Sequence, residues 1–486
     1  MYRNKGTITV FLSLISMLFL SLFCTMAESV RVQAARFQAA AAFDMGLFSI
    51  FGEYDRVLLE EYDLWFLDGS NEEQKIREVL ETKLEKYIQP NINPRYNLAA
   101  GRSWDVFPTE LDRCTVDKYA LATDHGGQVF YSQAVENQKE LFVGEAASAL
   151  KKNIKQMEEG HQKGEEYQNE EQKADEEYQR AQAAQMEEKK RQESEKENAE
   201  KQEESDTDIK ETEAVQAKVE NPLDQIKKIK SMGILGLVLK DGTVVSDKTI
   251  ERKNLPSERN LQKGSLLVNE ISADPVSEAI FLNYLQKHFQ CAVDEGGKHQ
   301  KGSKEHSLSY ELEYIIGGQK SDRENLKKTV NRILLIREGM NYATLAKSAK
   351  MRGEAMALAA AITGAAALPE FAGALQKLLM LAWAYGESLL DVRTLLAKGK
   401  VPMLKAETEW KLPLEKLGML AEVLKECDAG GGNGQSYEDY LSGLLILGKK
   451  QQRNLRVLDL IECNRRMEKG GETFRVDALV AQAEAS

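Results

Sequence analysis

Few side chains in this sequence have the types and the spacing that catalysis requires. Ser148 and Lys151 have the spacing of a serine–lysine nucleophile pair, but the companion motifs of that chemistry are missing. Residues 443–450 begin like a phosphate-binding loop, yet Lys450 stands where such a loop needs Ser or Thr to hold magnesium. Their interior is leucine and isoleucine, which is typical of a helix. Chance explains both matches.

The histidines and one pair of glutamates are the next candidates. His161, His299 and His306 each lack a second metal ligand at helical spacing. Glu311 and Glu313 lie two residues apart and share one face of an expected strand. A solvent-facing strand edge is a better interpretation of this pair than acid/base catalysis, because no partner is evident.

A charged triplet and the cysteines complete the search. Glu387 and Asp391 stand at i and i+4 with Arg393 nearby, which indicates either a helix-surface charge cluster or a polar network between helices. Cysteine pairing outside the cell is possible and cannot be read from the sequence. We predict no catalytic, cofactor-binding or metal-binding residues, no cofactor, and no enzymatic activity. The cysteines outside the apolar N-terminal segment are Cys114, Cys291, Cys427 and Cys463.

The amino-acid composition of the chain limits the classes of partner that it is expected to bind. The chain has 486 residues, a formal net charge of −12 and a pI of about 5.3. A nucleic-acid-binding protein needs a basic face that releases counterions from phosphates, so this balance excludes nucleic acid as the expected partner.

The N-terminal segment predicts a membrane anchor. Residues 6–27 carry no charge and are long enough, at about 1.5 Å per residue, to cross a hydrocarbon core of about 30 Å. A cleaved signal peptide is the alternative, since Arg3 and Lys5 form a basic head and Ala27 ends a passable cleavage site. The apolar stretch exceeds the usual length of a signal core, which favours an uncleaved anchor. Basic residues favour the N-terminus inside and the bulk of the chain outside the cell.

The anchor is expected to continue as a helix over residues 28–52 and to dock on a folded head. The docking side chains would be Phe37, Phe43, Leu47 and Phe51. The N-terminal residues 1–5 are then a cytoplasmic tail.

The fold class predicted is α+β, with a charged insertion. Residues 151–220 contain 13 Lys plus Arg and 22 Asp plus Glu, which indicates a solvated helix or a disordered spacer. A dimeric coiled coil is less favoured, because Tyr167, Tyr178 and Met186 do not follow a heptad. The expected regions are a small α+β head at 53–150, the acidic spacer at 151–221, a strand-containing α+β region at 222–320, a mainly helical bundle at 321–467 and a C-terminal tail at 468–486.

Local patterns supply the expected strands and helices. Strands are expected at 64–67, 127–131, 234–239 and 310–316, with Asp241 and Gly242 forming a hairpin turn. Ser321 and Glu324 form a capping box for a helix with Leu326 and Val330 on one face. The apolar stretches 355–368 and 371–386 are too short or too charged for membrane spans, and we interpret them as buried helices.

Several sequence blocks together resemble a known type of protein. Residues 5–11 (KGTITVF) and 27–36 (AESVRVQAAR), on either side of the apolar helix, are similar to the N-terminal anchors of TadE- and TadG-like pseudopilins of tight-adherence pili. Blocks at 53–56, 61–64, 122–127, 310–341, 382–388 and 436–441 resemble an uncharacterised family of membrane-anchored proteins from Gram-positive bacteria, a domain of unknown function associated with Tad-type pilus systems. Phe11, rather than Glu, stands at the fifth position after Gly6, which departs from type IV prepilins.

The resemblance implies a function without chemistry. We expect a non-enzymatic, single-pass, extracytoplasmic structural or assembly component of a Tad-like pilus or secretion system. Its partners would be membrane lipid and other assembly proteins, bound through the anchor helix and the head. The alternative is an independent cell-surface binding or adhesive protein whose charged spacer serves as a stalk.

Overall fold

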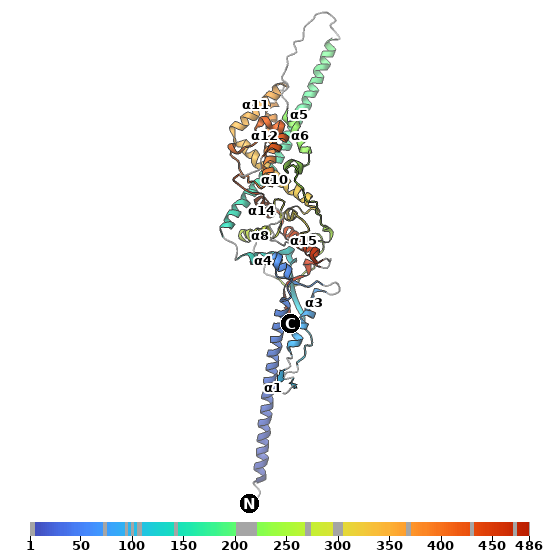
Figure 1. Ribbon diagram of the computed structural model, residues 1–486, viewed down its shortest axis with the longest axis vertical. Helices are drawn as coiled ribbons and strands as arrows, with labels where there is room; N and C mark the ends of the chain where they lie inside the picture. The colour runs from blue at the N-terminus through green and yellow to red at the C-terminus, as the bar shows by residue number, and fades with distance from the viewer. Residues whose placement is uncertain are drawn as a thin grey trace. The chain divides into compact units, whose positions relative to one another are not determined.

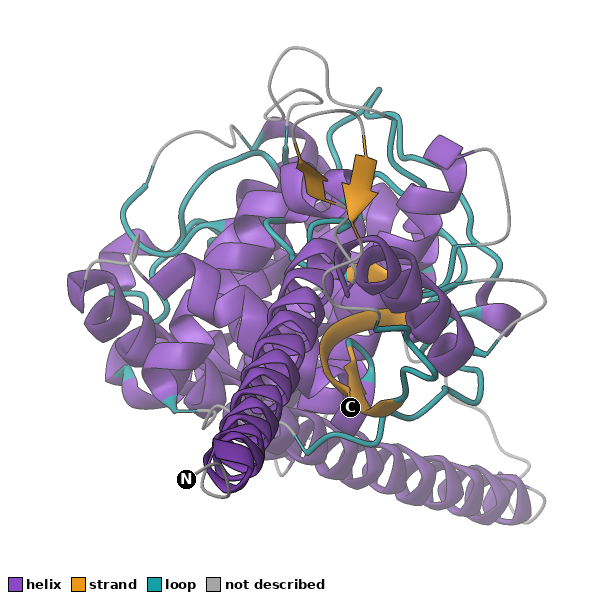
Figure 2. Ribbon diagram, turned by 90° about the horizontal axis from the view of Figure 1, so that it is seen from below, coloured by secondary structure: helices purple, strands orange, loops and turns teal. Residues whose placement is uncertain are grey.

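The computed structural model describes a mostly helical chain with few strands (Figure 2). It divides into two compact units. The first unit comprises Met1–Asn137, Leu255–Ile271 and Arg465–Ser486, and the second comprises Gln138–Asn254 and Ser272–Asn464. The residues described are 5–70, 75–92, 96–98, 102–104, 109–139, 144–200, 221–267, 274–294, 305–365, 371–427, 432–469 and 474–485.

The first unit combines helices with two small sheets. Its elements are α1 (Lys5–Phe51), α2 (Arg56–Tyr62), β1 (Leu67–Asp68), α3 (Ile76–Ile92), β2 (Tyr96–Leu98), β3 (Arg102–Trp104), β4 (Val116–Leu121), α4 (Asp124–Gln138) and, from the end of the chain, β5 (Leu479–Ala485). Strands β2 and β3 form an antiparallel pair, and the other three strands form a sheet in the order β1-β5-β4.

The C-terminal strand is the centre of that sheet. In β5, Val480 pairs with Leu67 of β1, and Ala485 pairs with Val116 of β4, both in antiparallel register. The sequence pattern predicts only a tail at 468–486, and the structure differs because a short strand of alternating small residues gains its order from two partners far away in the chain. The α+β class therefore holds for this unit.

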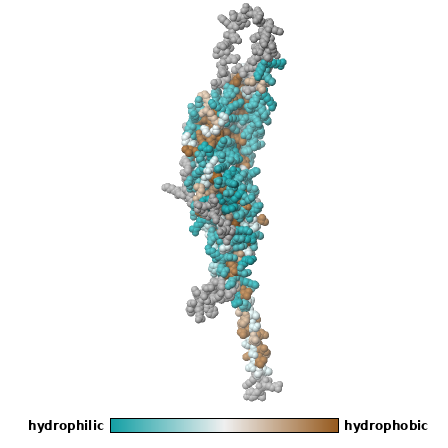
Figure 3. All heavy atoms as spheres, turned by 90° about the vertical axis from the view of Figure 1, so that its right-hand side faces the viewer, coloured by the Kyte–Doolittle hydropathy of each residue, from teal (hydrophilic) through white to brown (hydrophobic). Residues whose placement is uncertain are grey.

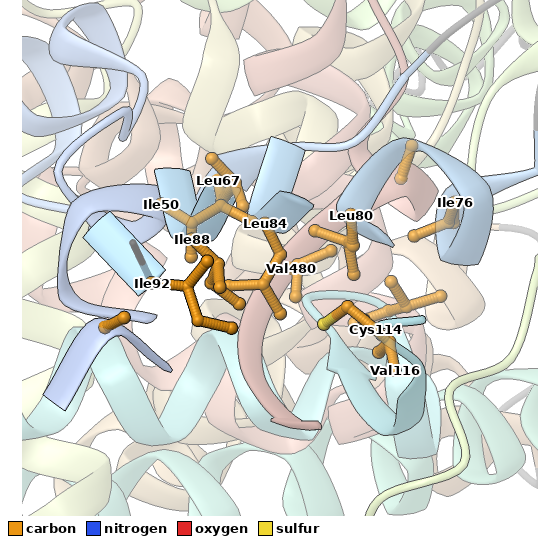
Figure 4. Packing of buried hydrophobic residues seen from close by; sticks show 13 residues of the cluster. Ile50, Leu67, Ile76, Leu80, Leu84, Ile88, Ile92, Cys114, Val116 and Val480 are labelled. Carbon is orange, nitrogen blue, oxygen red and sulfur yellow. The ribbon is translucent and has the colours of Figure 1, made fainter. Parts of the chain in front are cut away.

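The core of the first unit joins α1 and α3 to the sheet. Ile50 from α1, Leu80, Leu84 and Ile88 from α3, and Val480 from β5 are all buried in one cluster (Figure 4). The spacing of Leu80, Leu84 and Ile88 places them on one helical face, which is the reason α3 forms against this surface.

The second unit is a helical bundle. Its helices are α5 (Gly144–Glu200), α6 (Pro222–Ser231), α7 (Ile234–Val238), α8 (Pro275–His288), α9 (Glu311–Gly317), α10 (Asp322–Lys347), α11 (Ala349–Ala365), α12 (Ala372–Leu396), α13 (Leu420–Glu426), α14 (Tyr437–Leu447) and the larger part of α15 (Lys450–Lys469) (Figure 1). Ser321 is the N-cap of α10 and its side chain accepts a hydrogen bond from the Glu324 amide, as the capping pattern predicts.

Three expected strands are helical instead. Residues 127–131 lie in α4, residues 234–238 form α7, and Glu311–Gly317 is α9. All seven residues of α9 are buried. Alternation of polar and apolar residues indicates a strand only when one face of the segment is exposed to solvent. Both faces of α9 are buried, so the alternation does not predict its structure. Asp241 and Gly242 form a turn, but no strands flank it.

The expected acidic spacer is in part a packed helix. Met157, Tyr167 and Ala174 of α5 are buried in the bundle, and the Tyr167 hydroxyl donates to the Leu381 carbonyl at 3.0 Å. Gly164 of α5 and Gly339 of α10 lie so close that a Cβ on Gly339 would overlap the Gly164 nitrogen. These three residues are 10 and 7 positions apart, which places them on one side of the helix. The many charged residues between them make this pattern hard to recognise in the sequence. Residues 201–220 lie outside the described residues.

The two apolar stretches near residue 370 are helices of the bundle. Helix α12 buries every residue from Leu378 to Leu395, as the interpretation of 371–386 as a buried helix predicts. The stretch 355–368 lies mainly in α11, which packs on α12, and its last residues lie outside the described part of the chain.

Candidate functional site

The longest apolar surface that the structure describes belongs to α1. Among the described residues, this is the one helix long and apolar enough to cross a membrane, from Gly6 to Phe51. Its N-terminal half meets no other described part of the chain: Phe11 is 64% exposed, Leu18 67% and Phe23 66% (Figure 3). Exposed apolar area costs about 25 cal/mol per Å² in water, so an apolar environment would be energetically favourable for this half of α1.

Three polar side chains within this half of α1 are satisfied inside the helix. Thr9, Ser13 and Thr25 each donate a hydroxyl hydrogen bond to the carbonyl three residues earlier, at 2.9 Å in every case. Hydrocarbon offers no water to such groups, and internal bonding is what lets hydroxyls enter it. Charges begin only after this part, where Glu28 and Arg31 form an exposed ion pair at 3.2 Å.

The C-terminal half of α1 is built for packing. Ala42, Gly46 and Ile50 are buried against α3, and a Cβ on Gly46 would lie 2.6 Å from Ile88 Cγ1. The Gln38 amide donates to the Asn91 carbonyl at 2.9 Å. One uninterrupted helix thus carries a membrane-length apolar segment at one end and part of a folded core at the other.

The predicted docking residues are placed unequally. Phe43, Leu47 and Phe51 are partly buried against the core of the first unit, as expected. Phe37 is 77% exposed and does not dock. It lies on the other side of the helix from Ala42 and Gly46, so its expected role in docking was wrong.

The end of α1 is fixed to α3 by a polar contact. The Tyr87 hydroxyl donates to Glu53, and Lys83 lies 3.4 Å from the same carboxylate. The hydrogen bond from Tyr87 lowers the pKa of Glu53, and the Lys83 charge lowers it further against the opposing effect of burial. Glu53 therefore stays ionised where α1 ends.

The titratable side chains of the second unit form a buried ion network. Arg337 donates to Asp391 at 2.7 Å through Nη2 and at 3.0 Å through Nε. Lys405 lies 2.5 Å from the other oxygen of Asp391 and also contacts Glu387, which accepts from the Leu412 amide at 2.8 Å. Four of these side chains are fully or almost fully buried. Burial would raise the pKa of Asp391, but the charges of Arg337 and Lys405 outweigh it and lower that pKa.

This network has the features of a structural element. The Asn341 amide donates to Asp391 and to the Ser388 hydroxyl, both at 2.9 Å, and Arg337 also donates to the carbonyls of residues 402 and 403. Glu387 and Asp391 thus belong to a polar network between helices, one of the two possibilities that their spacing left open. Arg393 takes no part, since it donates to the carbonyls of Leu237 and Leu239.

Sequence reasoning missed the cations of this network. Arg337 and Lys405 lie 54 and 14 residues from Asp391 in the chain, and neither stands in a pattern with it. The available signal was indirect: two carboxylates stand within the mostly apolar sequence of α12, and buried carboxylates need cationic partners.

The glutamates of α9 are buried rather than solvent-facing. Glu311 contacts His306 Nδ1 at 2.8 Å and accepts from the Gln290 amide at 3.0 Å. Glu313 accepts from the Ala292 amide at 2.9 Å and from the Tyr437 hydroxyl at 2.8 Å. Burial raises the pKa of Glu313 to about 7, in spite of these two hydrogen bonds. The expected strand edge was wrong because both carboxylates hold loop backbone to the bundle.

The other sequence candidates remain separate. His161 is on α5, and its nearest acidic partner is Glu165 at 3.7 Å. His299 and the side chains of Ser148 and Lys151 lie outside the described residues. Residues 443–447 belong to helix α14, which is incompatible with a phosphate loop. In the described part of the chain, no group of three or more His, Cys, Asp or Glu side chains is arranged to hold a metal ion. No disulfide joins any of the five cysteines, all of which lie in the described part of the chain.

Comparison with known proteins identifies a family and nothing beyond it. The profile of a family described as "Family of unknown function (DUF5702)" matches residues 212–486. No curated protein and no solved structure matches the chain.

Proposed function

Because the chain belongs to the family of unknown function DUF5702, which carries no activity with it, we propose a function from the geometry: a non-enzymatic, single-pass membrane-anchored structural protein. The observation that carries this proposal is α1. Its exposed apolar half fits a bilayer, and its other half is part of the core of the first unit. A force on the apolar half of α1, or a displacement of it in the membrane, would then reach the folded unit directly, because no flexible linker separates the two.

The uncleaved anchor is favoured over a signal sequence by the continuity of this helix. Lys5–Phe51 contains no break in the helix at Ala27, where a signal peptidase would have to cut. Peptidases bind extended backbone, and cleavage there would require local unfolding of the helix. The proposed orientation keeps the N-terminus inside and both units outside, as Arg3 and Lys5, which precede the apolar stretch in the sequence, favour.

The assignment to a Tad-like pilus or secretion assembly is the finer part of the proposal. It rests on the resemblance of the anchor to TadE- and TadG-like pseudopilins and of the other blocks to a Tad-associated family. A lateral helix in the bilayer offers one association surface, and the folded units offer another. Other assembly proteins and lipid are the partners in this proposal.

The absence of enzymatic activity is proposed from how the buried acids and bases are used. Arg337, Asp391, Lys405 and Glu387 satisfy one another and nearby backbone in a closed network. A catalytic acid or base needs a face toward a substrate, and these fully buried groups have none.

Accessibility of one engineered thiol in intact cells tests the topology. Gln179 is exposed on α5, so Gln179→Cys would be placed in a full-length chain whose Cys24, Cys427 and Cys463 are serine. The two remaining thiols, Cys114 and Cys291, are buried. We expect a membrane-impermeant maleimide to label the Gln179→Cys variant before lysis, with the same background lacking this substitution as the control. Labelling only after lysis would contradict the proposed orientation.

Extraction tests the anchor itself. We expect the protein to stay in the membrane pellet at alkaline pH and its mass to include residues 1–27. Release into the soluble fraction, or a mass that begins after Ala27, would contradict an uncleaved anchor.

The alternative, an adhesive protein on a charged stalk, has one observation in its favour. The described side chains between Gln179 and Arg191 are all exposed, so this part of α5 extends beyond the packed face. The same helix buries Met157 and Tyr167, which makes its first part core rather than stalk. Crosslinking in cells discriminates the two: the structural proposal requires capture of other membrane-assembly proteins through α1, and the adhesive alternative requires none.

A further inference from the structure

A cavity of about 500 Å³ in the second unit has an unusual lining. Residues of helices α9, α10, α14 and α15 line it, together with His161 of α5. Its volume lies within the range of about 300–1,000 Å³ that small-molecule sites occupy. Five of its lining residues are cationic, and none is acidic, although the whole chain has a net charge of −12. The cations are Lys328, Arg332, Lys449, Arg453 and Arg456.

Three of these cations form no direct ion pair with a described carboxylate, although the charge of Asp459 acts on Arg456 and raises its pKa against the larger effect of burial. In the part of the chain that the structure describes, no carboxylate forms an ion pair with Lys328, Arg332 or Arg456. Arg453 differs, because Glu278 lies 2.7 Å from its Nη1 and neutralises it. The uncompensated charge of the cavity therefore comes from the other side chains.

A purely structural role explains part of this arrangement. Lys328 donates to the Gly317 carbonyl at 2.8 Å, and Arg456 donates to the carbonyls of Ile315 and Ile316 at 2.9 and 3.0 Å. Cations stabilise the C-terminal end of a helix, which α9 presents here. Arg332 adds only a long contact of 3.4 Å to Ile316, so a third cation is more than this short helix end needs.

The cluster is electrostatically costly without a ligand. Burial lowers the pKa of Lys328, and the charges of Arg332 and Arg456 lower it further. Burial also lowers the pKa of Arg332 and of Arg456. Like charges held together in partly buried positions repel, and an anion placed among them would relieve the repulsion.

The N-terminal end of α15 adds a further positive electrostatic contribution to the cavity, from the backbone. Gly448, Lys449 and Gln452 line the cavity where α15 begins, and the first turn of this 20-residue helix contains no acidic residue. The positive end of a helix dipole favours an anion. Gly448 and Lys449, which lie near the end of the phosphate-loop match rejected from the sequence, thus line the same cavity as the cations.

We propose that this cavity binds a small phosphorylated molecule that carries at least two negative charges. The guanidinium groups of Arg332 and Arg456 have the planar donor geometry that phosphate oxygens match, and Lys328 supplies a point charge. A ligand with two or more negative charges would balance Lys328 and Arg332 and the part of the Arg456 charge that Asp459 leaves uncompensated. The proposal goes beyond the membrane-anchored structural role and is independent of it.

Calorimetric titration of the full-length protein in an uncharged detergent tests this proposal, with inorganic pyrophosphate as the probe. We expect binding with a Kd tighter than about 1 mM, and weaker binding as salt is raised. Arg332→Gln and Lys328→Gln should each weaken it by about tenfold or more. Lys327→Gln, one residue away on the exposed face of α10, is the matched control and should bind as the parent does.

A stability measurement separates ligand binding from helix capping. We expect Lys328→Gln to leave the melting temperature of the ligand-free protein unchanged or higher, because it removes like-charge repulsion, and to abolish the rise that pyrophosphate causes. A lower melting temperature together with unchanged pyrophosphate binding would show that the cluster only caps α9 and would overturn the proposal. So would absent binding of pyrophosphate to the parent, or equal binding of citrate, a polycarboxylate of similar charge.

Discussion

The ion network around Arg337 shows how a single side chain holds several helices. Arg337 of α10 is fully buried, and burial would lower its pKa, but the charge of Asp391 outweighs this and raises it. Its guanidinium also donates to Asn341 at 3.0 Å and to the Tyr440 hydroxyl at 3.2 Å. Removing one member leaves the others charged and without compensation in a low-dielectric interior.

We expect Asp391→Ala to lower the free energy of unfolding of the second unit by about 3–5 kcal/mol, because it leaves Arg337 buried without a carboxylate and leaves Lys405 with Glu387 alone. Denaturant unfolding of the full-length protein in detergent measures this. Tryptophan fluorescence in a Trp65→Phe, Trp104→Phe background reports on the second unit through Trp383 and Trp410.

The control for this change is an exposed ion pair in the same unit. Arg323 and Asp247 lie 3.0 Å apart, with side chains 56% and 76% exposed. Asp247→Ala should cost no more than about 1 kcal/mol. Equal effects of the two substitutions would mean that the network around Arg337 is not a buried one.

Glu313 gives the second unit a pH dependence. Burial raises its pKa from 4.5 to about 7, so the folded state binds a proton that the unfolded state has already lost. Its contribution to stability is complete below about pH 4.5 and declines as the pH rises through about 7. The size of this contribution is on the order of 3 kcal/mol.

We expect Glu313→Gln to reduce this pH dependence, because glutamine keeps an acceptor for the Ala292 amide and carries no titrating proton. Unfolding at about pH 5 and about pH 8 should show the variant gaining stability relative to the parent at the higher pH. Glu338, whose pKa burial raises to about 8, is present in both proteins and cancels in the difference. The exposed Glu324→Gln is the control, and a variant that follows the parent at both pH values would refute this role of Glu313.

At the scale of elements, the crossing of α5 and α10 decides whether the acidic segment is core or spacer. Gly164 and Gly339 bring the two backbones into direct contact, and Gly160 stands where a Cβ would lie 2.7 Å from Ile336. Glycine is required here because of this close approach and not because of its backbone angles. These three glycines thereby allow the long charged helix α5 to pack closely against the bundle.

We expect Gly339→Ala to destabilise the second unit by about 1–3 kcal/mol or more, since the added methyl group meets backbone that cannot rotate away. Gly353→Ala on α11, where no atom lies within 4 Å of the added Cβ, is the control and should stabilise by up to about 1 kcal/mol. Thermal unfolding of the two variants and the parent measures both effects. Destabilisation by both would assign the effect to glycine replacement in general.

The sequence predicts those elements whose signal is local. The apolar half of α1 is predicted from a run of uncharged residues alone, and the start of α10 is predicted from Ser321 and Glu324 in a capping box. The elements it does not predict depend on distant partners. The sequence of α9 wrongly predicts a strand because both faces of this helix are buried. The sequence of β5 predicts only a tail because its hydrogen-bonding partners in β4 lie more than 350 residues earlier in the chain.

The same reason limits prediction of the sites. Glu387 and Asp391 are visible as a pair on one helix, but their cations come from α10 and from the loop after α12. The cationic cavity assembles Lys328, Arg332 and Arg456 from two helices separated by more than 100 residues. No spacing rule joins such residues before the chain is folded.

At the scale of the whole molecule, the family segment and the folding units do not coincide. The matched residues 212–486 contain neither α5 nor β1 and β4, and each of the two units draws on chain that lies before residue 212. The segment defined by family membership is therefore not a folding unit.

We expect a fragment of residues 212–486 to remain without stable tertiary structure. It lacks the helix that fills the groove over Gly339, and its β5 has no partner strand. Amide exchange and limited proteolysis compare it with the full-length protein in detergent. Native-like protection of α10 and α12 in the fragment would show that the bundle folds without α5.

The central position of β5 also orders events during synthesis. Translation produces α1 before the bundle helices and the seven residues of β5 after them, yet β1 and β4 are joined only through β5. The sheet of the unit that contains the membrane-length helix is therefore completed only after the helices of the bundle have been synthesised. A chain that terminates before Leu479 would keep α1 and lose this sheet, so proteases that recognise unpaired strands could distinguish such a chain from one that contains β5.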